Sequence, residues 1–517
     1  MSALDRAWRR LTTPEMTVRR IVLGLAGLIV VSFLLRTTAL HGRYWIDEGL
    51  SVGIASHPLT DIPGVLRADG SPPLYYMLLK LWIGVIGGDG EARTHALSLG
   101  FALLTVPAGF FSARALFDER AGWFVAVVAA LNPFLNYYAQ ETRMYALVVL
   151  LSLLVAATFG LAFVERKRVW LVGFVLASTA LIYSHNWGLF TMVGTVAALL
   201  PLLWSRRVPW TDAAIAYGAI ALLYLPWLPT LLYQVDHTGA PWSRSPTLNG
   251  LPGALAGLAG GPGPGVGILL AVGTGIFAYA SIREGDAPAR QSSTANSTLI
   301  IVVVGIAVAF VVSQISPAWS GRYFAALIGP FVLLIGVGLA RAGVLGLVTL
   351  ALLAGLWMKP PTFRVNNKSD VHRVAAVVGP RLAPGDIVVS THPEQLPVVH
   401  FYFPKGLRWG DGMGWVKDPT YMDWRDALDR YEAARPTQVA QRFIAALRPG
   451  QQLALVQPII RSGSWSAPWT ELVRKRASRW ERVLGRDDRL QRVAALPVLK
   501  GRGLPRGVRV VIYRRVG

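Results

Sequence analysis

Cysteine is absent from the 517-residue sequence, and this absence excludes several kinds of site. A chain without thiols forms no disulfides, binds no metal through thiolates and has no cysteine nucleophile. Acidic residues are also scarce, 29 against 51 Lys and Arg, which gives a formal charge of +22. That excess fits an anionic membrane surface or phosphate-bearing substrates, although a compositional bias of the genome or of a lipid-facing chain would produce it as well.

Apolar sequence, in contrast, is abundant. Hydrophobic residues make up 53% of the chain and the mean hydropathy is +0.44, too apolar for a water-soluble protein of several domains. A bilayer core about 30 Å thick needs roughly 20 apolar residues in a helix, and about eleven runs approach that length. These runs are 21–40, 94–116, 121–139, 143–164, 169–184, 187–204, 212–234, 264–282, 298–315, 323–340 and 343–358. The first run lacks a small-residue cleavage pattern, so we expect it to stay as a membrane anchor.

A shorter apolar segment, Leu74 to Gly87, follows Pro72-Pro73 and contains Lys80. About 14 residues are too few to cross a bilayer, so the segment is expected to be a helix lying in the membrane interface. Alternating the other spans from a cytoplasmic N-terminus then leaves fifteen Lys and Arg inside and eight outside. This asymmetry follows the positive-inside rule, and an odd number of spans places the C-terminal segment outside the plasma membrane.

The long apolar runs stop near residue 359. Short β-like runs follow at Asp386–Ser390, Leu453–Ile460 and Val508–Tyr513, with helical patterns between them. The sequence therefore predicts a polytopic α-helical membrane module, residues 1–358, with a large first external loop, 41–93, and a soluble extracytoplasmic α/β domain, residues 359–517. Residues 360–517 contain 27 Lys and Arg against 13 Asp and Glu, an excess that fits contact with anionic lipid or an acidic glycan.

Polar residues gather in four loops that this topology places on the external side. Charged groups beside a membrane are costly and usually functional. The four loops carry Tyr44-Trp45-Ile46-Asp47-Glu48, Gln140-Glu141-Thr142-Arg143-Met144-Tyr145, Tyr183-Ser184-His185-Asn186-Trp187 and Ser320-Gly321-Arg322-Tyr323.

The acids of these loops have a structural and a catalytic interpretation. Asp47-Glu48 could form an acidic helix end, and Glu141 could pair with Arg143. A partly desolvated carboxylate at an apolar helix end can also take a proton from an incoming hydroxyl or amine. The position of these acids at one interface favours the catalytic interpretation.

The cationic residues of these loops also have a structural interpretation beside the functional one. His185 by itself is more often a satisfied helix-end residue, and Arg322 with Tyr323 could anchor a helix at the aromatic belt. An Arg about 4 Å from a phosphate, however, gains on the order of 4 kcal/mol at an effective dielectric constant near 20. Phosphate binding by Arg322 is therefore the stronger hypothesis.

The segment from 44 to 146 resembles a known family. The likeness is carried in chain order by Tyr44-Trp45-Ile46-Asp47-Glu48, Asp69-Gly70-Ser71-Pro72-Pro73-Leu74-Tyr75-Tyr76, the stretch from Arg114 to Gly122, and Gln140-Glu141-Thr142-Arg143-Met144-Tyr145. In these motifs the chain is similar to the GT-C membrane glycosyltransferases, in the bacterial branch related to protein O-mannosyltransferases and the lipid A aminoarabinose transferase. The resemblance covers about 300 residues, and the order of the motifs is far more specific than any one of them.

This resemblance implies a polyprenyl-phosphate sugar donor, a cell-envelope acceptor (glycan, lipid or protein), a reaction at the external face and inversion at the anomeric carbon. Carried over by motif, Asp47 is the expected general base, Glu48 and Glu141 shape the acceptor site, and Arg322 with Tyr323 meets the donor phosphate. The substrate-binding candidates are Tyr44, Trp45, Tyr75, Tyr76, Tyr145 and Asn186.

One departure from the pattern concerns phosphate binding. Close relatives in the aminoarabinose branch tend to have a Lys before the proline of the second motif, where this chain has Ser71. The cation is then expected to come from elsewhere, with Lys80, Arg143 and His185 as candidates. The departure also weakens any transfer of substrate identity.

The expected mechanism is a single displacement in which an acceptor deprotonated by Asp47 attacks the sugar C1 as polyprenyl phosphate leaves. This chemistry requires no cofactor, although Asp47, Glu48, Glu141 and His185 could hold a divalent metal. Nucleic acid is not an expected partner. The alternatives are a transporter or lipid flippase, which more often shows repeated halves and midplane charges, and a non-catalytic glycan-binding scaffold.

Overall fold

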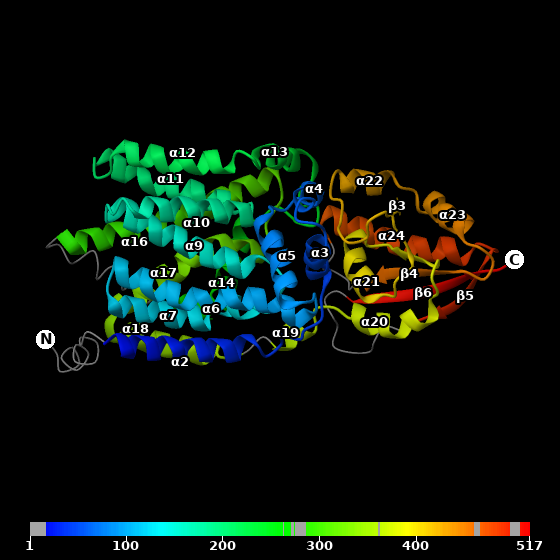
Figure 1. Cartoon of the computed structure of the whole chain (residues 1–517), viewed down its shortest axis with the longest axis horizontal. Helices are drawn as coiled ribbons and strands as arrows, with labels where there is room; N and C mark the ends of the chain where they lie inside the picture. The colour runs from blue at the N-terminus through cyan, green and yellow to red at the C-terminus, as the bar shows by residue number, and fades with distance from the viewer. Residues whose placement is uncertain are drawn as a thin grey trace. The chain divides into compact units, whose positions relative to one another are not determined.

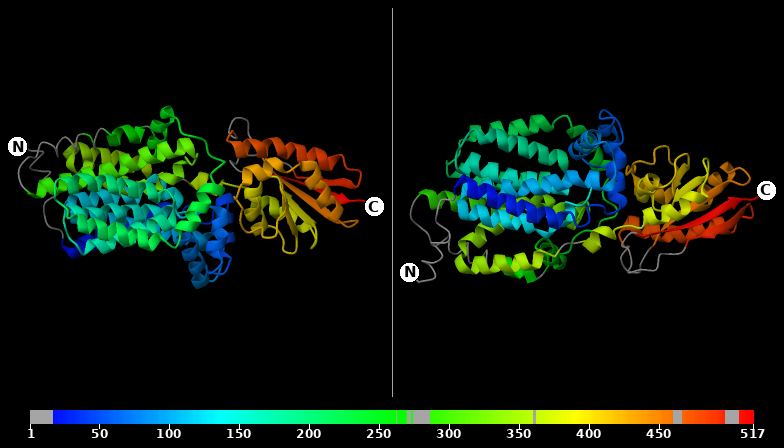
Figure 2. Two further views of the ribbon diagram at one scale, coloured as in Figure 1. Left: turned by 90° about the horizontal axis from the view of Figure 1, so that it is seen from above. Right: turned by 60° about the horizontal axis from the view of Figure 1, so that its bottom comes forward.

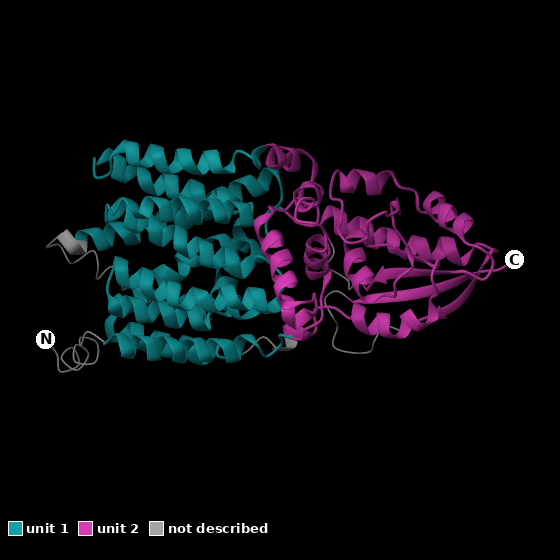
Figure 3. Ribbon diagram, in the orientation of Figure 1, with its two compact units in different colours: residues 1–40, 95–228, 245–362 teal, residues 41–94, 229–244, 363–517 magenta. Residues whose placement is uncertain are grey.

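A computed structural model describes residues 17–261, 263–269, 273, 286–359, 362–459, 466–496 and 507–517. The chain divides into two compact units, each assembled from separate stretches of sequence (Figures 1 and 3). Unit 1 contains residues 1–40, 95–228 and 245–362, and unit 2 contains residues 41–94, 229–244 and 363–517. The domain boundary that the sequence predicts between residues 358 and 359 stays a prediction.

Unit 1 is a bundle of apolar helices that run alongside one another, as Figure 2 also shows from two further sides. Within it, α17 packs against α9, α7, α16 and α18. The helices and short turns are α2 (Val18–Arg36), α6 (Glu91–Leu116), α7 (Glu119–Leu131), α8 (Pro133–Tyr138), α9 (Tyr145–Phe159), η1 (Gly160–Val164), α10 (Trp170–Ser184), α11 (Gly188–Trp204), α12 (Trp210–Tyr224), η2 (Leu248–Gly250), α14 (Leu251–Leu258), α16 (Asp286–Ile315), η3 (Gly321–Phe324), α17 (Ala325–Arg341) and α18 (Gly343–Trp357).

Within the described residues, five helical stretches are long and apolar enough to cross a membrane. They are Val18–Arg36, Glu91–Leu116, Tyr145–Val164, Ala289–Ile315 and Gly321–Arg341. Apolar helices of 10–17 residues also cover the predicted runs 169–184, 187–204 and 343–358. Most of the predicted run 264–282 lies outside the described residues, so the number of about eleven spans stays a prediction.

Two predicted runs are not continuous helices. The run 121–139 breaks at Asn132, whose side chain accepts a hydrogen bond from the Leu135 amide (3.1 Å), and Pro133 begins α8. The run 212–234 bends by 67° between α12 and α13 (Leu228–His237), at a break that contains Pro226. Proline lacks an amide hydrogen and clashes with the preceding helical turn, which explains both interruptions.

A buried arginine joins the helices at one end of unit 1. Arg36, in the last turn of α2, donates to Asn136 Oδ1 (3.1 Å) and to the carbonyls of Ala102 and Ala129 (both 2.6 Å). These contacts tie α2 to α6, α7 and α8. A guanidinium has five N–H donors, so it can satisfy carbonyls from several helices at once.

Unit 2 is built around a mixed sheet with helices on both faces. The sheet order is β3-β2-β1-β4-β6-β5, with β2, β1 and β4 parallel and the other pairs antiparallel. Its strands are β1 (Ile387–Ser390), β2 (Arg408–Asp411), β3 (Gly414–Trp415), β4 (Gln452–Pro458), β5 (Leu490–Ala495) and β6 (Val508–Arg515). Its helices and turns are α3 (Ile46–Ala55), α4 (Ile62–Asp69), α5 (Leu74–Ile86), α13, α19 (Thr362–Asn366), α20 (Val371–Val378), η4 (Gly379–Arg381), η5 (Pro393–Gln395), α21 (Leu396–Tyr402), α22 (Ala427–Ala433), α23 (Pro436–Ala446) and α24 (Pro468–Gly485).

Alternation along the strands fills two cores. Val388 faces α20 and α21, whereas its neighbours Ile387 and Val389 face α23 and α24. Successive side chains of a strand point to opposite faces, so a strand covered on both faces is apolar throughout. The predicted α/β fold of the C-terminal segment is thus confirmed. The three predicted β-like runs form β1, β4 and β6, and Ile460 of the second run lies outside the described residues.

Candidate functional site

The acidic motif forms the start of α3. Trp45 has extended backbone angles, and Asp47 and Glu48 occupy the first helical turn. Acidic side chains are favoured there because the helix dipole leaves partial positive charge at its N-terminus. The helix ends at Ala55, and the hydroxyl of the next residue, Ser56, donates to the Gly53 carbonyl (2.6 Å).

Helix α3 is buried within unit 2. Val52 belongs to the core formed with β1 and β4, and Leu50 belongs to an aromatic core that contains Trp424. Gly49 lies against the backbone of Val398, where an added Cβ would be 2.6 Å from the Val398 Cα. The 41–94 segment therefore contributes its acidic helix to the same compact unit as residues 363–517.

The two acids of α3 have different surroundings. Glu48 is fully buried, and its Oε2 lies 2.6 Å from Nζ of Lys368, which is also buried. Asp47 keeps 8% of its surface exposed. Residues 41–94 and 363–517 also meet at the far end of α3, where His57 Nε2 lies 2.8 Å from Asp418 Oδ2.

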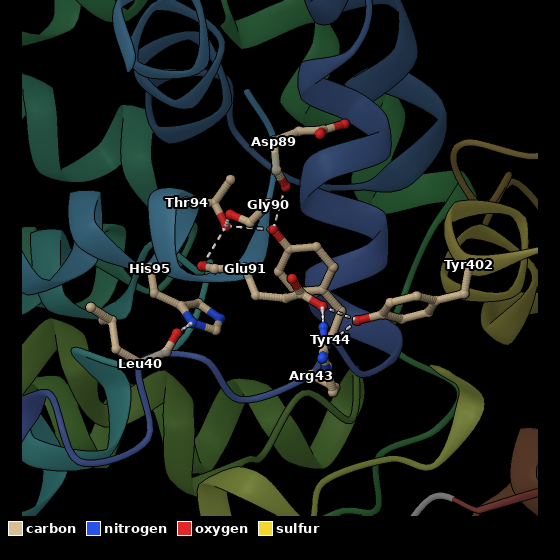
Figure 4. A network of polar contacts seen from close by, with 9 residues as sticks. All are labelled: Leu40, Arg43, Tyr44, Asp89, Gly90, Glu91, Thr94, His95 and Tyr402. Atoms are coloured by element: carbon tan, nitrogen blue, oxygen red, sulfur yellow. Dashed lines mark hydrogen bonds and ion pairs between the residues drawn. The ribbon is translucent and has the colours of Figure 1, made fainter. Parts of the chain in front are cut away.

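Tyr44 belongs to a hydrogen-bond network in unit 2 (Figure 4). Its hydroxyl lies 2.6 Å from Thr94 Oγ1, and its amide donates to the Tyr402 hydroxyl (2.8 Å). Tyr402 in turn donates to Glu91 Oε1 (2.9 Å), which also pairs with Arg43 (3.0 Å). Burial raises the pKa of both tyrosines, so both stay neutral. These contacts give Tyr44 a structural role in unit 2, and its contact with substrate stays a prediction.

A second set of predicted residues meets in unit 1. The ring of His185 lies 6.0 Å from that of Tyr145 and 5.0 Å from that of Tyr323, measured between centroids. The Arg143 guanidinium lies 5.7 Å from the Tyr145 centroid, and that of Arg322 lies 5.5 Å from the Tyr323 centroid. We call these five residues the cationic-aromatic cluster.

Helix ends bring this cluster together. Tyr145 begins α9, His185 directly follows α10, and Arg322 and Tyr323 lie in η3 immediately before α17. The sequence places His185 where α10 stops, and its imidazole Nδ1 accepts a hydrogen bond from the Trp187 amide (3.1 Å). Polar side chains at the ends of apolar helices can thus gather without entering the apolar bundle.

The charge state of His185 follows from its surroundings. Burial, and then the positive charges of Arg143 and Arg322, lower its pKa from 6.5 to about 3. The imidazole is therefore neutral at pH 7. Because Nδ1 accepts from Trp187, the proton lies on Nε2, which can donate to a phosphate or sugar oxygen.

Lowering the pH is therefore expected to destabilise the protein, because the buried His185 takes up a proton less readily than it does in the unfolded chain. The unfolded side chain binds a proton near pH 6.5, whereas the folded one stays neutral down to about pH 3. This stabilisation is complete above pH 6.5 and declines as the pH falls, by about 1.4 kcal/mol per pH unit for one proton. In thermal-shift measurements between about pH 7 and 5, His185→Gln should lose less stability than the parent. The control is the same substitution at the exposed His41. Equal losses of stability in His185→Gln and in the parent would contradict a buried neutral His185.

The remaining predicted residues lie in both units. Glu141, in unit 1, is fully buried, and Asn186, also in unit 1, follows His185. In unit 2, Tyr75 and Tyr76 are fully buried in α5, and Lys80 Nζ donates to the Ser56 carbonyl (3.2 Å). Their roles in substrate or phosphate binding stay predictions.

Sequence reasoning did not identify Lys368 as the partner of Glu48. The two are 320 positions apart, and no motif surrounds the lysine. Tyr138, whose ring lies 4.8 Å from that of Tyr145, was also missed as a neighbour of the cationic-aromatic cluster. The available signal for Tyr138 was its position two residues before the motif that begins at Gln140. Trp187, which the third polar loop already included, lies 5.7 Å from Tyr323.

The possible metal ligands do not form one group in the described part of the chain. Among the residues that the structure describes, no three His, Asp or Glu side chains come together as potential metal ligands. A divalent metal held by Asp47, Glu48, Glu141 and His185 stays a prediction.

Sequence comparison gives no relative, since no protein-family model and no curated protein matches the chain. Solved structures do match it. ArnT from Cupriavidus metallidurans bound to undecaprenyl phosphate matches over 97% of this chain and 99% of its own, with a TM-score of 0.62 and 14% identity.

Two further structures agree in fold. Arabinofuranosyltransferase AftD from Mycobacteria matches over 97% of this chain and 42% of its own, with a TM-score of 0.53 and 16% identity. The oligosaccharyltransferase AglB from Archaeoglobus fulgidus, in complex with an inhibitory peptide and a dolichol-phosphate, matches over 88% and 70%, with a TM-score of 0.51 and 10% identity. The apolar helices of unit 1 and these likenesses identify the chain as a multi-pass membrane protein with the GT-C glycosyltransferase fold.

Proposed function

We propose that the protein transfers a sugar from a polyprenyl-phosphate donor to a cell-envelope acceptor at the external face of the plasma membrane. The observation that carries this proposal is the cationic-aromatic cluster, in which two arginines and a neutral histidine lie among tyrosine rings. Guanidinium groups and tyrosine hydroxyls suit a phosphate. The fold neighbour ArnT is bound to undecaprenyl phosphate, which supports the same class of ligand here.

The proposed reaction is a single displacement with inversion at C1. The acceptor oxygen or nitrogen forms a bond to C1 as the bond from C1 to the phosphate oxygen breaks, and the acceptor proton passes to Asp47. Polyprenyl phosphate leaves with the bonding electrons, and Arg143 and Arg322 stabilise its negative charge. Glu48 and Glu141 shape the acceptor site in this scheme.

The remaining parts of the proposal concern location. The N-terminus is cytoplasmic and residues 359–517 lie outside, as the distribution of Lys and Arg favours. The positive excess of the C-terminal segment suits contact with anionic lipid. These assignments rest on sequence and charge.

A deletion strain tests the function whichever sugar is transferred. Mass spectrometry of its envelope glycans, lipids and glycoproteins should show a product that lacks one sugar, and the polyprenyl-phosphate sugar should accumulate. The parent gene should restore the product, whereas a gene encoding Arg322→Ala should restore little of it. An unchanged envelope in the deletion strain would overturn the proposal.

A further inference from the structure

The acidic helix lies at the edge of the sheet where α/β proteins usually bind ligands. The parallel strands β1 and β4 are neighbours, and β2 lies on the other side of β1, so the chain reverses its direction of winding at β1. In open α/β sheets, ligands bind outside the carboxyl ends of the strands at such a reversal. Here η5 and α21, which follow the carboxyl end of β1, pack against α3.

Unit 2 thus packs α3 at the position where an α/β protein usually binds a ligand. Tyr44 and Val52 enter the core beside β1 and β4, while Trp45, Ile46 and Leu50 enter the aromatic core. Both sets of contacts fix α3 along its length. The orientation of Asp47 and Glu48, in the first turn of α3, then depends on the side chains around them.

Lys368 meets Glu48 from a well-anchored segment. It lies between α19 and α20, and its Nζ is 2.6 Å from Glu48 Oε2, with 2% of the lysine exposed. Two residues later, Asp370 accepts a hydrogen bond from the Val508 amide (2.8 Å) and so ties the segment to β6. A buried ion pair of this kind holds both partners in one geometry, because leaving either charge alone in the interior is costly.

We infer that Lys368 is a positioning residue for glycosyl transfer: its ion pair with Glu48 fixes the first turn of α3, which presents Asp47. The inference rests on the proposed function. It assigns the Glu48 carboxylate, which is fully buried, to the ion pair, and Asp47, which is 8% exposed, keeps its proposed role as the proton acceptor.

The test measures rates with purified parent and variant proteins added to membranes of the deletion strain, which supply both donor and acceptor. Product is followed by mass spectrometry as the amount of membrane is varied. For Lys368→Met, we expect the maximal rate to fall on the order of 10²-fold, the scale of a misplaced catalytic group, with the half-saturating amount of membrane unchanged. Lys368→Arg should recover part of the rate, since the charge stays and only the shape of the donor changes.

A double variant separates positioning from folding. Replacing a buried ion pair by apolar residues usually keeps a protein folded, so Glu48→Leu with Lys368→Met should recover the thermal stability but not the maximal rate. The control is His57→Gln, which removes the contact with Asp418 at the other end of α3 and should leave the maximal rate near that of the parent.

A parental rate in the double variant would show that the pair serves folding alone and would overturn the inference. A change in the half-saturating amount with an unchanged maximal rate would assign Lys368 to substrate binding and overturn it as well. Absence of product with the parent protein would overturn the proposed function, and with it the inference.

Discussion

Asp47→Asn is expected to abolish most sugar transfer while leaving donor binding intact. The amide keeps the shape of the carboxylate but cannot accept the acceptor's proton, and loss of a general base typically costs on the order of 10²–10⁴ in rate. Donor binding should persist because the substitution leaves Arg143 and Arg322, which are proposed to bind the phosphate, unchanged. Turnover with deletion-strain membranes and titration with undecaprenyl phosphate measure the two effects separately.

The matched control for this substitution is Asp61→Asn. Asp61 also belongs to unit 2 and precedes a helix, α4, but its side chain is exposed. The control should keep parental turnover, which would show that removing a carboxylate from this unit is not by itself harmful. Near-parental turnover in Asp47→Asn would eliminate Asp47 as the base and direct attention to Glu48 or Glu141.

Much of the fold could be predicted because burial leaves a direct trace in the sequence. Helices in lipid and strands covered on both faces are apolar over their whole length, and this pattern revealed most of unit 1 as well as β1, β4 and β6. The strands that were missed lack this trace. β2 carries Arg408 and Asp411 at its ends, β3 has two residues, and β5 is an edge strand with largely exposed side chains.

The site was less accessible to sequence reasoning because its contacts are distant in the chain. Local motifs indicated Asp47 and Glu48, and helix ends indicated His185 and Arg322, because each is unusual in its immediate surroundings. The pairing of Glu48 with Lys368 spans 320 positions, and a single lysine in a basic segment carries no local signal. A discontinuous unit of this kind appears only when the chain is folded.

Arg322→Ala is expected to weaken binding of undecaprenyl phosphate by about 1.5–3 kcal/mol, the usual value for a hydrogen bond to a charged group. That loss corresponds to roughly a 10- to 150-fold increase in the dissociation constant. The expectation follows from the position of Arg322 before α17, where its guanidinium lies beside Tyr323 and its charge contributes to the lowered pKa of His185. Calorimetric titration of purified protein measures the affinity, and a thermal-shift measurement checks the fold.

Arg322→Lys distinguishes a phosphate ligand from a membrane anchor. Lysine keeps the charge but loses the planar fork that can donate two parallel hydrogen bonds to a phosphate, so it should recover part of the affinity. Either cation would serve as an anchor at the lipid headgroups, and in that case both variants would bind undecaprenyl phosphate as the parent does and differ at most in stability. The control for the loss of one positive charge is Arg207→Ala. Arg207 is an exposed arginine of unit 1 that contacts Ser293 (3.1 Å), and its replacement should leave the affinity unchanged. Equal affinities in Arg322→Ala and Arg207→Ala would contradict the assignment of Arg322 to the donor phosphate.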